Sequence, residues 1–99
     1  MKINNECIKE VLNYVIEKSE VVFNTTSSGY KGVSILSVIK ELAEDSKYSE
    51  SVVLHSCLYA YNFSLIITDK RIDLKNLIPA MIDILDVTPS GYKFLEENS

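Results

Sequence analysis

The sequence predicts one α+β domain of the winged helix-turn-helix class over residues 1–99, with three helices, a β-hairpin wing and a C-terminal helix. Three observations support this prediction. Apolar residues recur at helical spacing in three segments of the first two thirds of the chain. Two β-like runs with a charged turn between them follow. The length of 99 residues and the 46% apolar content suit a single domain with its own core.

The first helix is expected over residues 4–18, where Asn4 or Asn5 can supply the N-terminal cap. Its apolar residues recur at three- and four-residue spacing: Ile8, Val11, Leu12, Val15 and Ile16. Residues 21–23 form a short β-like run. The nine turn-forming residues 24–32 then predict a surface loop.

A second helix is expected over residues 33–44, a short connection over residues 45–48, and a third helix over residues 50–62 that is capped by Ser49. The third helix has almost no polar face. Its apolar residues, with the next aromatic, are Val52, Val53, Leu54, Cys57, Leu58, Tyr59, Ala60, Tyr61 and Phe63. A helix of this kind either lies in a core or forms an interaction surface.

Residues 64–68 read as a strand and residues 69–73 as a charged turn. Thr88-Pro89 then opens the last helix, because a capping hydroxyl is followed by proline at the first helical position. This helix is anchored by three apolar side chains, Tyr92, Phe94 and Leu95.

The segment 74–87 is ambiguous. Its apolar residues follow the helical period, but Pro79 would fall inside a helix and cost ~3 kcal/mol. A strand over residues 80–87, which closes the wing hairpin, avoids that cost and is the preferred interpretation.

Charge and cysteine usage narrow the possible roles. The net charge of -4 argues against a protein that holds nucleic acid by bulk positive charge. Cys7 and Cys57 are expected to be buried reduced thiols, although one bridge is conceivable. The N-terminus lacks the apolar core of a signal peptide, and no stretch approaches a membrane span. We therefore expect a cytoplasmic protein.

The sequence predicts no enzyme. His55 is the only histidine, and Cys57 points in another direction from the same helix, so the two do not form a nucleophile and its base. Residues 29–34 place glycines and a lysine before a helix without the full phosphate-loop pattern. The acidic clusters are typical of a solvated helix end and a wing edge: Glu41, Glu44 and Asp45, and Asp83 and Asp86. We expect no catalytic residue, no metal and no cofactor.

DNA binding is the usual suggestion of a helix-turn-helix, but the residues oppose it. The third helix contains no lysine or arginine with which to read bases or hold phosphates. A wing contact could come from Lys70, Arg71 and Lys75, although Asp69 and Asp73 offset that charge. A sequence-specific DNA-binding regulator is therefore the alternative function.

The leading prediction is protein–protein contact through the third helix. Its candidate interface residues, for a partner or for a homodimer, are Tyr48, His55, Tyr59, Asn62 and Phe63. The competing interpretation is that the aromatic side chains fill the core under the wing. An acidic interaction module of this kind suits a basic partner, such as a host nucleic-acid-handling machine.

Three segments resemble an uncharacterised winged-helix family of Gram-positive bacteria and their phages, akin to the YjcQ proteins. The segments are residues 1–12, Tyr48-Ser49-Glu50 and residues 87–95. The resemblance implies a winged-helix fold and a phage or prophage setting, and it assigns no catalytic residue. The chain departs from the family at Tyr92, where histidine is usual, and in stopping after the last helix.

Overall fold

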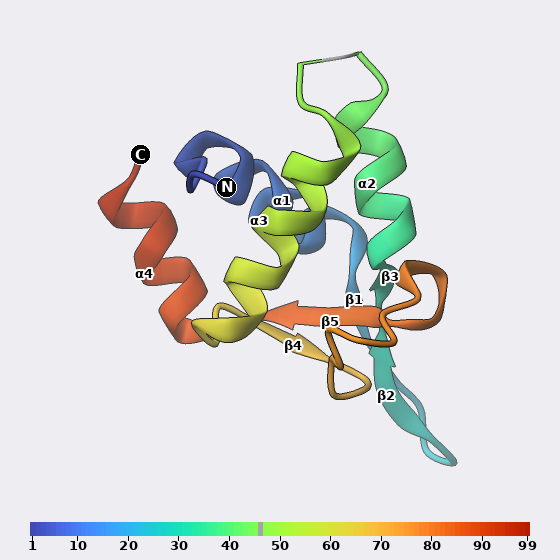
Figure 1. The fold of residues 1–99 in the computed structure, drawn as a ribbon. Coiled ribbons are helices and arrows are strands. Elements are labelled where there is room, and N and C mark those ends of the chain that lie inside the picture. The colour runs from blue at the N-terminus through green and yellow to red at the C-terminus, as the bar shows by residue number, and fades with distance from the viewer. Residues whose placement is uncertain (46) are drawn as a thin grey trace.

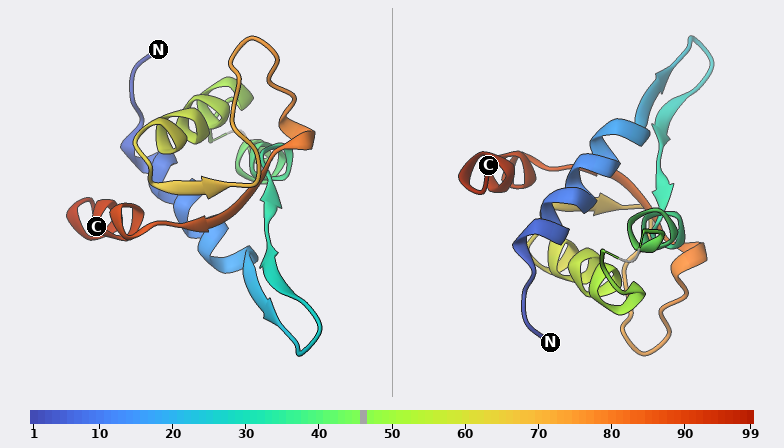
Figure 2. Two further views of the ribbon diagram at one scale, coloured as in Figure 1. Left: turned by 90° about the horizontal axis from the view of Figure 1, so that it is seen from below. Right: turned by 90° about the horizontal axis from the view of Figure 1, so that it is seen from above.

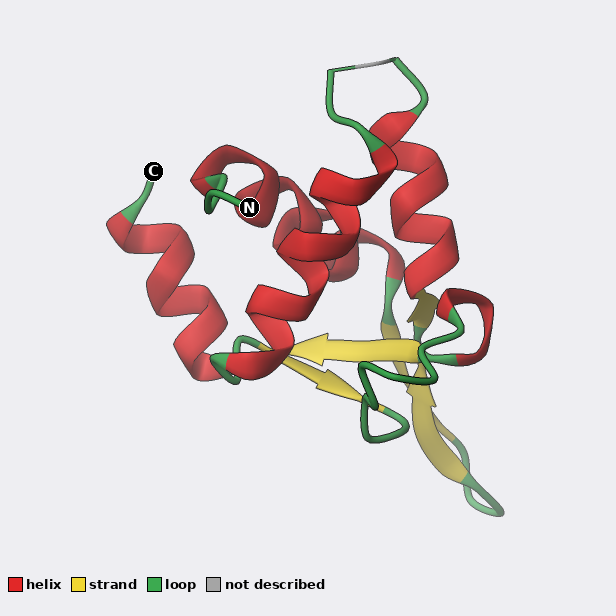
Figure 3. Ribbon diagram, in the orientation of Figure 1, coloured by secondary structure: helices red, strands yellow, loops and turns green. Residues whose placement is uncertain are grey.

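The computed structural model describes residues 1–45 and 47–99 and shows a mixed α+β chain with two small antiparallel sheets (Figures 1 and 3). The elements, in chain order, are α1 (Asn5–Lys18), β1 (Glu20–Phe23), β2 (Ser28–Lys31), β3 (Val33–Ser34), α2 (Ile35–Ala43), α3 (Glu50–Asn62), β4 (Ile66–Thr68), the 3-10 helix η1 (Pro79–Met81), β5 (Asp83–Val87) and α4 (Pro89–Glu97). None of these helices has both the length and the apolar character needed to cross a membrane.

Side-chain caps fix where the helices begin. Asn4 accepts the Cys7 N–H at 3.0 Å, Ser49 accepts the Val52 N–H at 3.2 Å, and Thr88 accepts the Gly91 N–H at 3.1 Å. The expected starts of the first, third and last helices are therefore confirmed. A short connection links α2 to α3 as expected, although Ser46 in its middle lies outside the described residues.

The three-stranded sheet has the order β3-β5-β4, with β5 in the centre and both neighbours antiparallel to it. Val33 pairs with Ile84 and Ile66 pairs with Val87. The pairing of residues 33–34 with β5 explains why α2 begins at Ile35, two residues later than the sequence predicts. Ser34, which ends β3, caps α2 by accepting the Ser37 N–H at 3.1 Å.

The second sheet is a two-stranded hairpin, β1–β2, and it corrects one prediction. Residues 24–32 were expected to form a loop, but Ser28–Lys31 is a strand that pairs with all of β1. The loop is confined to residues 24–27, where the Asn24 side chain accepts the backbone N–H groups of Thr26 and Ser27. This Asx-type turn reverses the chain early enough for the following residues to pair.

The strand interpretation of the ambiguous segment is confirmed for Asp83–Val87. The strand begins three residues later than predicted because Pro79 opens a short 3-10 helix. Proline is tolerated there because the first turn of a helix has no acceptor for its N–H. The loop between β4 and β5, where the sequence predicts a wing, therefore extends over residues 69–82 and is called the wing loop below.

Helices α1, α2 and α3 lie together on one side of the three-stranded sheet, whereas α4 lies at its end (Figure 1). The core between the three helices and the sheet is almost entirely apolar, and its fully buried apolar side chains are Cys7, Ile8, Val11, Leu12, Val15, Ile35, Val38, Val53, Cys57, Ala60 and Ile84. The one buried polar side chain among the described residues, Ser56, donates its hydroxyl to the Val52 carbonyl at 2.9 Å. Cys7 and Cys57 are both buried and form no disulfide, in agreement with the prediction of reduced thiols.

Candidate functional site

Helix α3 meets α1, α2 and the sheet, so most of its apolar circumference is covered. Val53, Cys57 and Ala60 are fully buried, and a second set of α3 side chains packs against the core from its sides: Val52, Leu54, Leu58, Tyr59 and Tyr61. Tyr61 also accepts the backbone N–H of Ile72 from the wing loop at 3.3 Å. Contact on several sides explains a helix without a polar face.

Four of the five predicted interface residues lie at helical spacing along one side of α3, and the fifth, Tyr48, precedes the helix. Tyr48 is only 8% exposed and Tyr59 packs against the core, whereas His55 is half-buried and Asn62 is exposed. Phe63 is 61% exposed and stacks on Tyr59, with ring centroids 4.4 Å apart. Only part of this set is therefore available to a partner.

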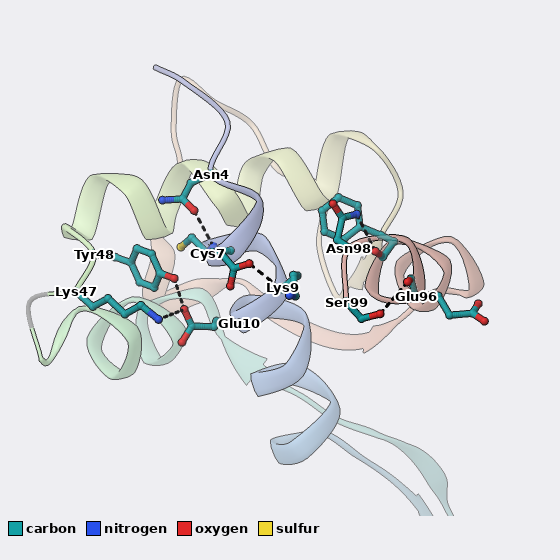
Figure 4. Close-up of polar contacts among 11 residues, drawn as sticks. Asn4, Cys7, Lys9, Glu10, Lys47, Tyr48, Glu96, Asn98 and Ser99 are labelled. Carbon is teal, nitrogen blue, oxygen red and sulfur yellow. Dashed lines mark hydrogen bonds and ion pairs between the residues drawn. The ribbon is translucent and has the colours of Figure 1, made fainter.

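Tyr48 instead joins the connection between α2 and α3 to helix α1 (Figure 4). Its hydroxyl donates a hydrogen bond to the Glu10 carboxylate, and the Lys47 ammonium lies 3.4 Å from the same carboxylate. The Lys47 nitrogen also lies 5.3 Å from the centre of the Tyr48 ring. Burial, with the adjacent carboxylate, raises the pKa of Tyr48 to about 12, so the hydroxyl stays a donor at neutral pH.

The buried thiols offer no nucleophile at neutral pH. Burial raises the pKa of Cys57 to about 12, and burial is also the main cause of the raised pKa of Cys7. Within residues 1–45 and 47–99, no cluster of His, Cys, Asp and Glu is arranged to hold a metal ion. The glycine-lysine segment 29–34 belongs to β2, β3 and their junction, not to a loop that could cradle phosphate.

The three basic residues predicted for a wing contact lie on or beside the wing loop. The Lys70 ammonium donates to the Met81 carbonyl at 2.9 Å and so braces the loop. Arg71 and Lys75 line one open depression with Asp73, whose carboxylate accepts the Lys75 N–H at 3.0 Å. The same loop exposes three apolar side chains, Leu74, Ile78 and Met81. Basic, acidic and apolar groups are therefore mixed on this loop.

The β1–β2 hairpin carries a surface that the sequence reading missed. It extends away from the helices and the three-stranded sheet, as both views of Figure 2 show, and all of its strand residues are exposed. Val21 lies opposite Tyr30 and Phe23 lies opposite Ser28, so these four side chains share one face of the hairpin. Val21 is 67% exposed, Phe23 81% and Tyr30 50%. This set of three, Val21, Phe23 and Tyr30, is called the hairpin face below.

A hollow of about 100 Å³ lies at the base of the hairpin face. Its lining comes from α1, the hairpin, β5 and α4: Ile16, Ser19, Glu20, Val21, Tyr30, Leu85, Asp86 and Tyr92. The apolar surface of the hairpin therefore continues past Val21 and Tyr30 to the exposed side chains of Ile16 and Tyr92. The sequence carried a signal for this surface. The apolar β-like run Val21-Val22-Phe23 is followed by turn-forming residues and then by a further aromatic residue, Tyr30.

No family model, no curated protein and no solved structure matches the chain.

Proposed function

We propose that the chain is a small winged-helix module that acts by protein–protein contact, without catalysis, and that the hairpin face is its contact surface. The observation that carries the proposal is the exposure of Val21, Phe23 and Tyr30 on one side of a regular hairpin. Large contiguous apolar patches are uncommon on monomeric proteins and mark interaction sites. Aromatic side chains in particular are enriched in interface cores.

The order of elements supports the winged-helix part of the proposal. A short strand, β3, leads into the helix pair α2 and α3, and β4 and β5 then flank a long loop in the position of a wing. The hairpin β1–β2 is inserted between α1 and β3, so it is an addition to this arrangement.

DNA binding remains the second candidate function, because Arg71 is exposed on the wing loop and makes no ion pair with any described residue. The exposed residues of α3, however, are Glu50, Ser51 and Asn62, which supply no positive charge for phosphates. Binding to duplex DNA that weakens steeply with salt and is lost in Arg71→Ala would make this candidate the better account.

Capture from a lysate tests the protein-contact proposal. The immobilised chain is exposed to a nuclease-treated lysate of the cells that encode it, and bound proteins are identified by mass spectrometry. Phe23→Ser removes the most exposed side chain of the hairpin face, and Leu74→Ser is the matched control, because Leu74 is 66% exposed on the wing loop. We expect a protein that Leu74→Ser retains and Phe23→Ser loses.

Two results would contradict the proposal. One is that an untreated lysate yields only nucleic acid and the nuclease-treated lysate yields no bound protein. The other is that Phe23→Ser retains the same proteins in the same amounts as the unaltered chain.

A further inference from the structure

We propose that the occupant of the hairpin face is a second copy of this chain, which pairs its own β1 edge to edge with the first and inserts its Phe23 into the hollow at the base of the hairpin. This inference rests on the proposed function and names its partner.

One edge of β1 pairs with β2, and its other edge pairs with no described strand. The Asn24 N–H donates to the Ser27 carbonyl at 3.0 Å, so these two residues form a hydrogen-bonded pair that closes the hairpin. Hydrogen-bonded and non-hydrogen-bonded pairs alternate along an antiparallel ladder. The backbone groups of Val22 therefore point toward β2, and those of Val21 and Phe23 point outward from the edge.

This edge is unprotected. Between Glu20 and Asn24 it carries neither charge nor proline, and β1 pairs with β2 alone among the described strands. Edge strands of soluble proteins are usually blocked by such devices, because exposed backbone groups recruit another strand. A two-stranded hairpin is also only marginally stable by itself, and added strands stabilise it.

Antiparallel pairing of two β1 strands about a two-fold axis at Val22 places Val21 of each copy opposite Phe23 of the other. All outward N–H and C=O groups of Val21 and Phe23 then find partners, in two hydrogen-bonded pairs. The single charge of the edge, Glu20, lies opposite Asn24 of the other copy, so the two carboxylates stay apart.

Directly opposed residues of an antiparallel pair point to the same face, so the two hairpin faces merge into one apolar surface. Phe23 of one copy then lies beside Val21 of the other, which lines the hollow together with Tyr30 and Tyr92. The most exposed side chain of the hairpin face thus meets the hollow of its partner, and the contact is reciprocal.

The area is adequate for a weak dimer. Burial of the exposed parts of the hairpin face, Val22, Ile16 and Tyr92 in both copies removes on the order of 1,000 Å² from water. Specific interfaces begin at about 1,200 Å², so we expect a dissociation constant in roughly the micromolar range. Each copy carries a net charge of -4, so added salt should strengthen the association by screening repulsion.

Sedimentation equilibrium over a concentration series tests the dimer with two variants. Val21→Pro removes an outward N–H without taking a hydrogen bond from β2, and edge strands tolerate proline at such positions. Phe23→Ser empties the hollow and leaves the backbone edge intact. Both should weaken dimerisation at least about tenfold, whereas Leu74→Ser should dimerise like the unaltered chain, and circular dichroism checks that each variant is folded.

The inference is overturned if the unaltered chain stays monomeric up to roughly 1 mM, or if both variants dimerise with unchanged affinity. A monomer that still captures a protein through Phe23 would remove the dimer and leave the protein-contact function standing. If both variants lose the dimer and the chain captures no other protein, the contact function is restricted to self-association.

Discussion

Gly32 lies so close to the backbone of Ile84 that a Cβ at position 32 would stand 2.5 Å from the Ile84 carbonyl oxygen. This contact is the joint between the protruding hairpin and the body, because Gly32 separates β2 from β3 and Ile84 lies in the central strand β5. The absence of a side chain at residue 32 is what allows the chain to leave the hairpin and enter the three-stranded sheet.

Gly32→Ala should therefore destabilise the protein. The obstructing atoms are backbone, which cannot rotate away, so we expect a loss of about 1–3 kcal/mol in the free energy of unfolding. Gly29→Ala is the matched control, because a Cβ there meets no atom within 4 Å. Urea denaturation followed by circular dichroism measures both, and equal losses in the two variants would show that the contact with Ile84 is unimportant.

Ser64→Gly should stabilise the protein. Ser64 has a φ of 58°, in the left-handed region that favours glycine, and it ends α3 in a Schellman motif. In this motif the Ser64 N–H bonds to the Tyr61 carbonyl at 3.1 Å and the Leu65 N–H bonds to the Ala60 carbonyl at 2.8 Å. Removing the Cβ relieves steric strain, which we expect to raise the free energy of unfolding by about 0.5–1 kcal/mol.

Ser51→Gly, on the exposed side of α3, controls for the general effect of glycine and should destabilise by about 0.5 kcal/mol. Thermal or urea unfolding distinguishes the two variants. A loss of stability of the same size in Ser64→Gly would mean that the left-handed conformation carries no strain.

Tyr48→Phe should reduce the free energy of unfolding by about 1–2 kcal/mol, because the hydrogen bond to the Glu10 carboxylate is lost. Tyr92→Phe is the control, since Tyr92 is exposed. Urea titrations of both variants at pH 7 measure the difference, and a Tyr48→Phe protein as stable as the control would contradict the role given to this bond.

The Tyr48 contribution should also depend on pH. Its pKa is raised to about 12 in the folded state, above the ordinary tyrosine value of about 10. The folded state therefore holds the Tyr48 proton more tightly, and the resulting stability is complete below about pH 10 and is lost as the pH rises toward 12. The stability difference between the unaltered chain and Tyr48→Phe should shrink over that interval, and a constant difference would exclude the proposed coupling.

The two thiols should resist modification in the folded protein. Burial raises the pKa of both Cys7 and Cys57, so neither presents a thiolate or an accessible sulfur at pH 8. A disulfide reagent should label them roughly a hundredfold more slowly than in denaturant. Mass spectrometry identifies the labelled cysteine, and rapid labelling of Cys57 under native conditions would contradict its burial.

The hairpin shows why part of the fold could not be predicted locally. Of residues 28–31 only Tyr30 has a strong strand propensity, and Ser28 and Gly29 favour turns. They become a strand because the turn at Asn24 brings them beside β1, and because Lys31 continues through Gly32 into the sheet. Pairing of this kind depends on a partner strand, which single-residue propensity does not report.

The exposure of the predicted interface on α3 likewise could not be predicted from local sequence. The absence of a polar face on α3 was visible in the sequence, but whether its apolar side chains fill the core depends on how many neighbours the helix has. Contact with α1, α2 and the sheet covers most of it, and Tyr48 turns inward to Glu10. The larger exposed apolar surface lies instead on the hairpin, at Val21, Phe23 and Tyr30.

The sequence by itself predicted the four helices and the caps of three of them, because apolar periodicity and capping oxygens act within a few residues of the chain. It also indicated reduced cysteines and a strand over residues 80–87, since proline disfavours the alternative helix, and the structure confirms the strand for Asp83–Val87. The tertiary structure alone decided the pairing of β2, the order β3-β5-β4 and the surface left uncovered. These features depend on contacts between residues far apart in the chain, and no local pattern encodes which surfaces such contacts will bury.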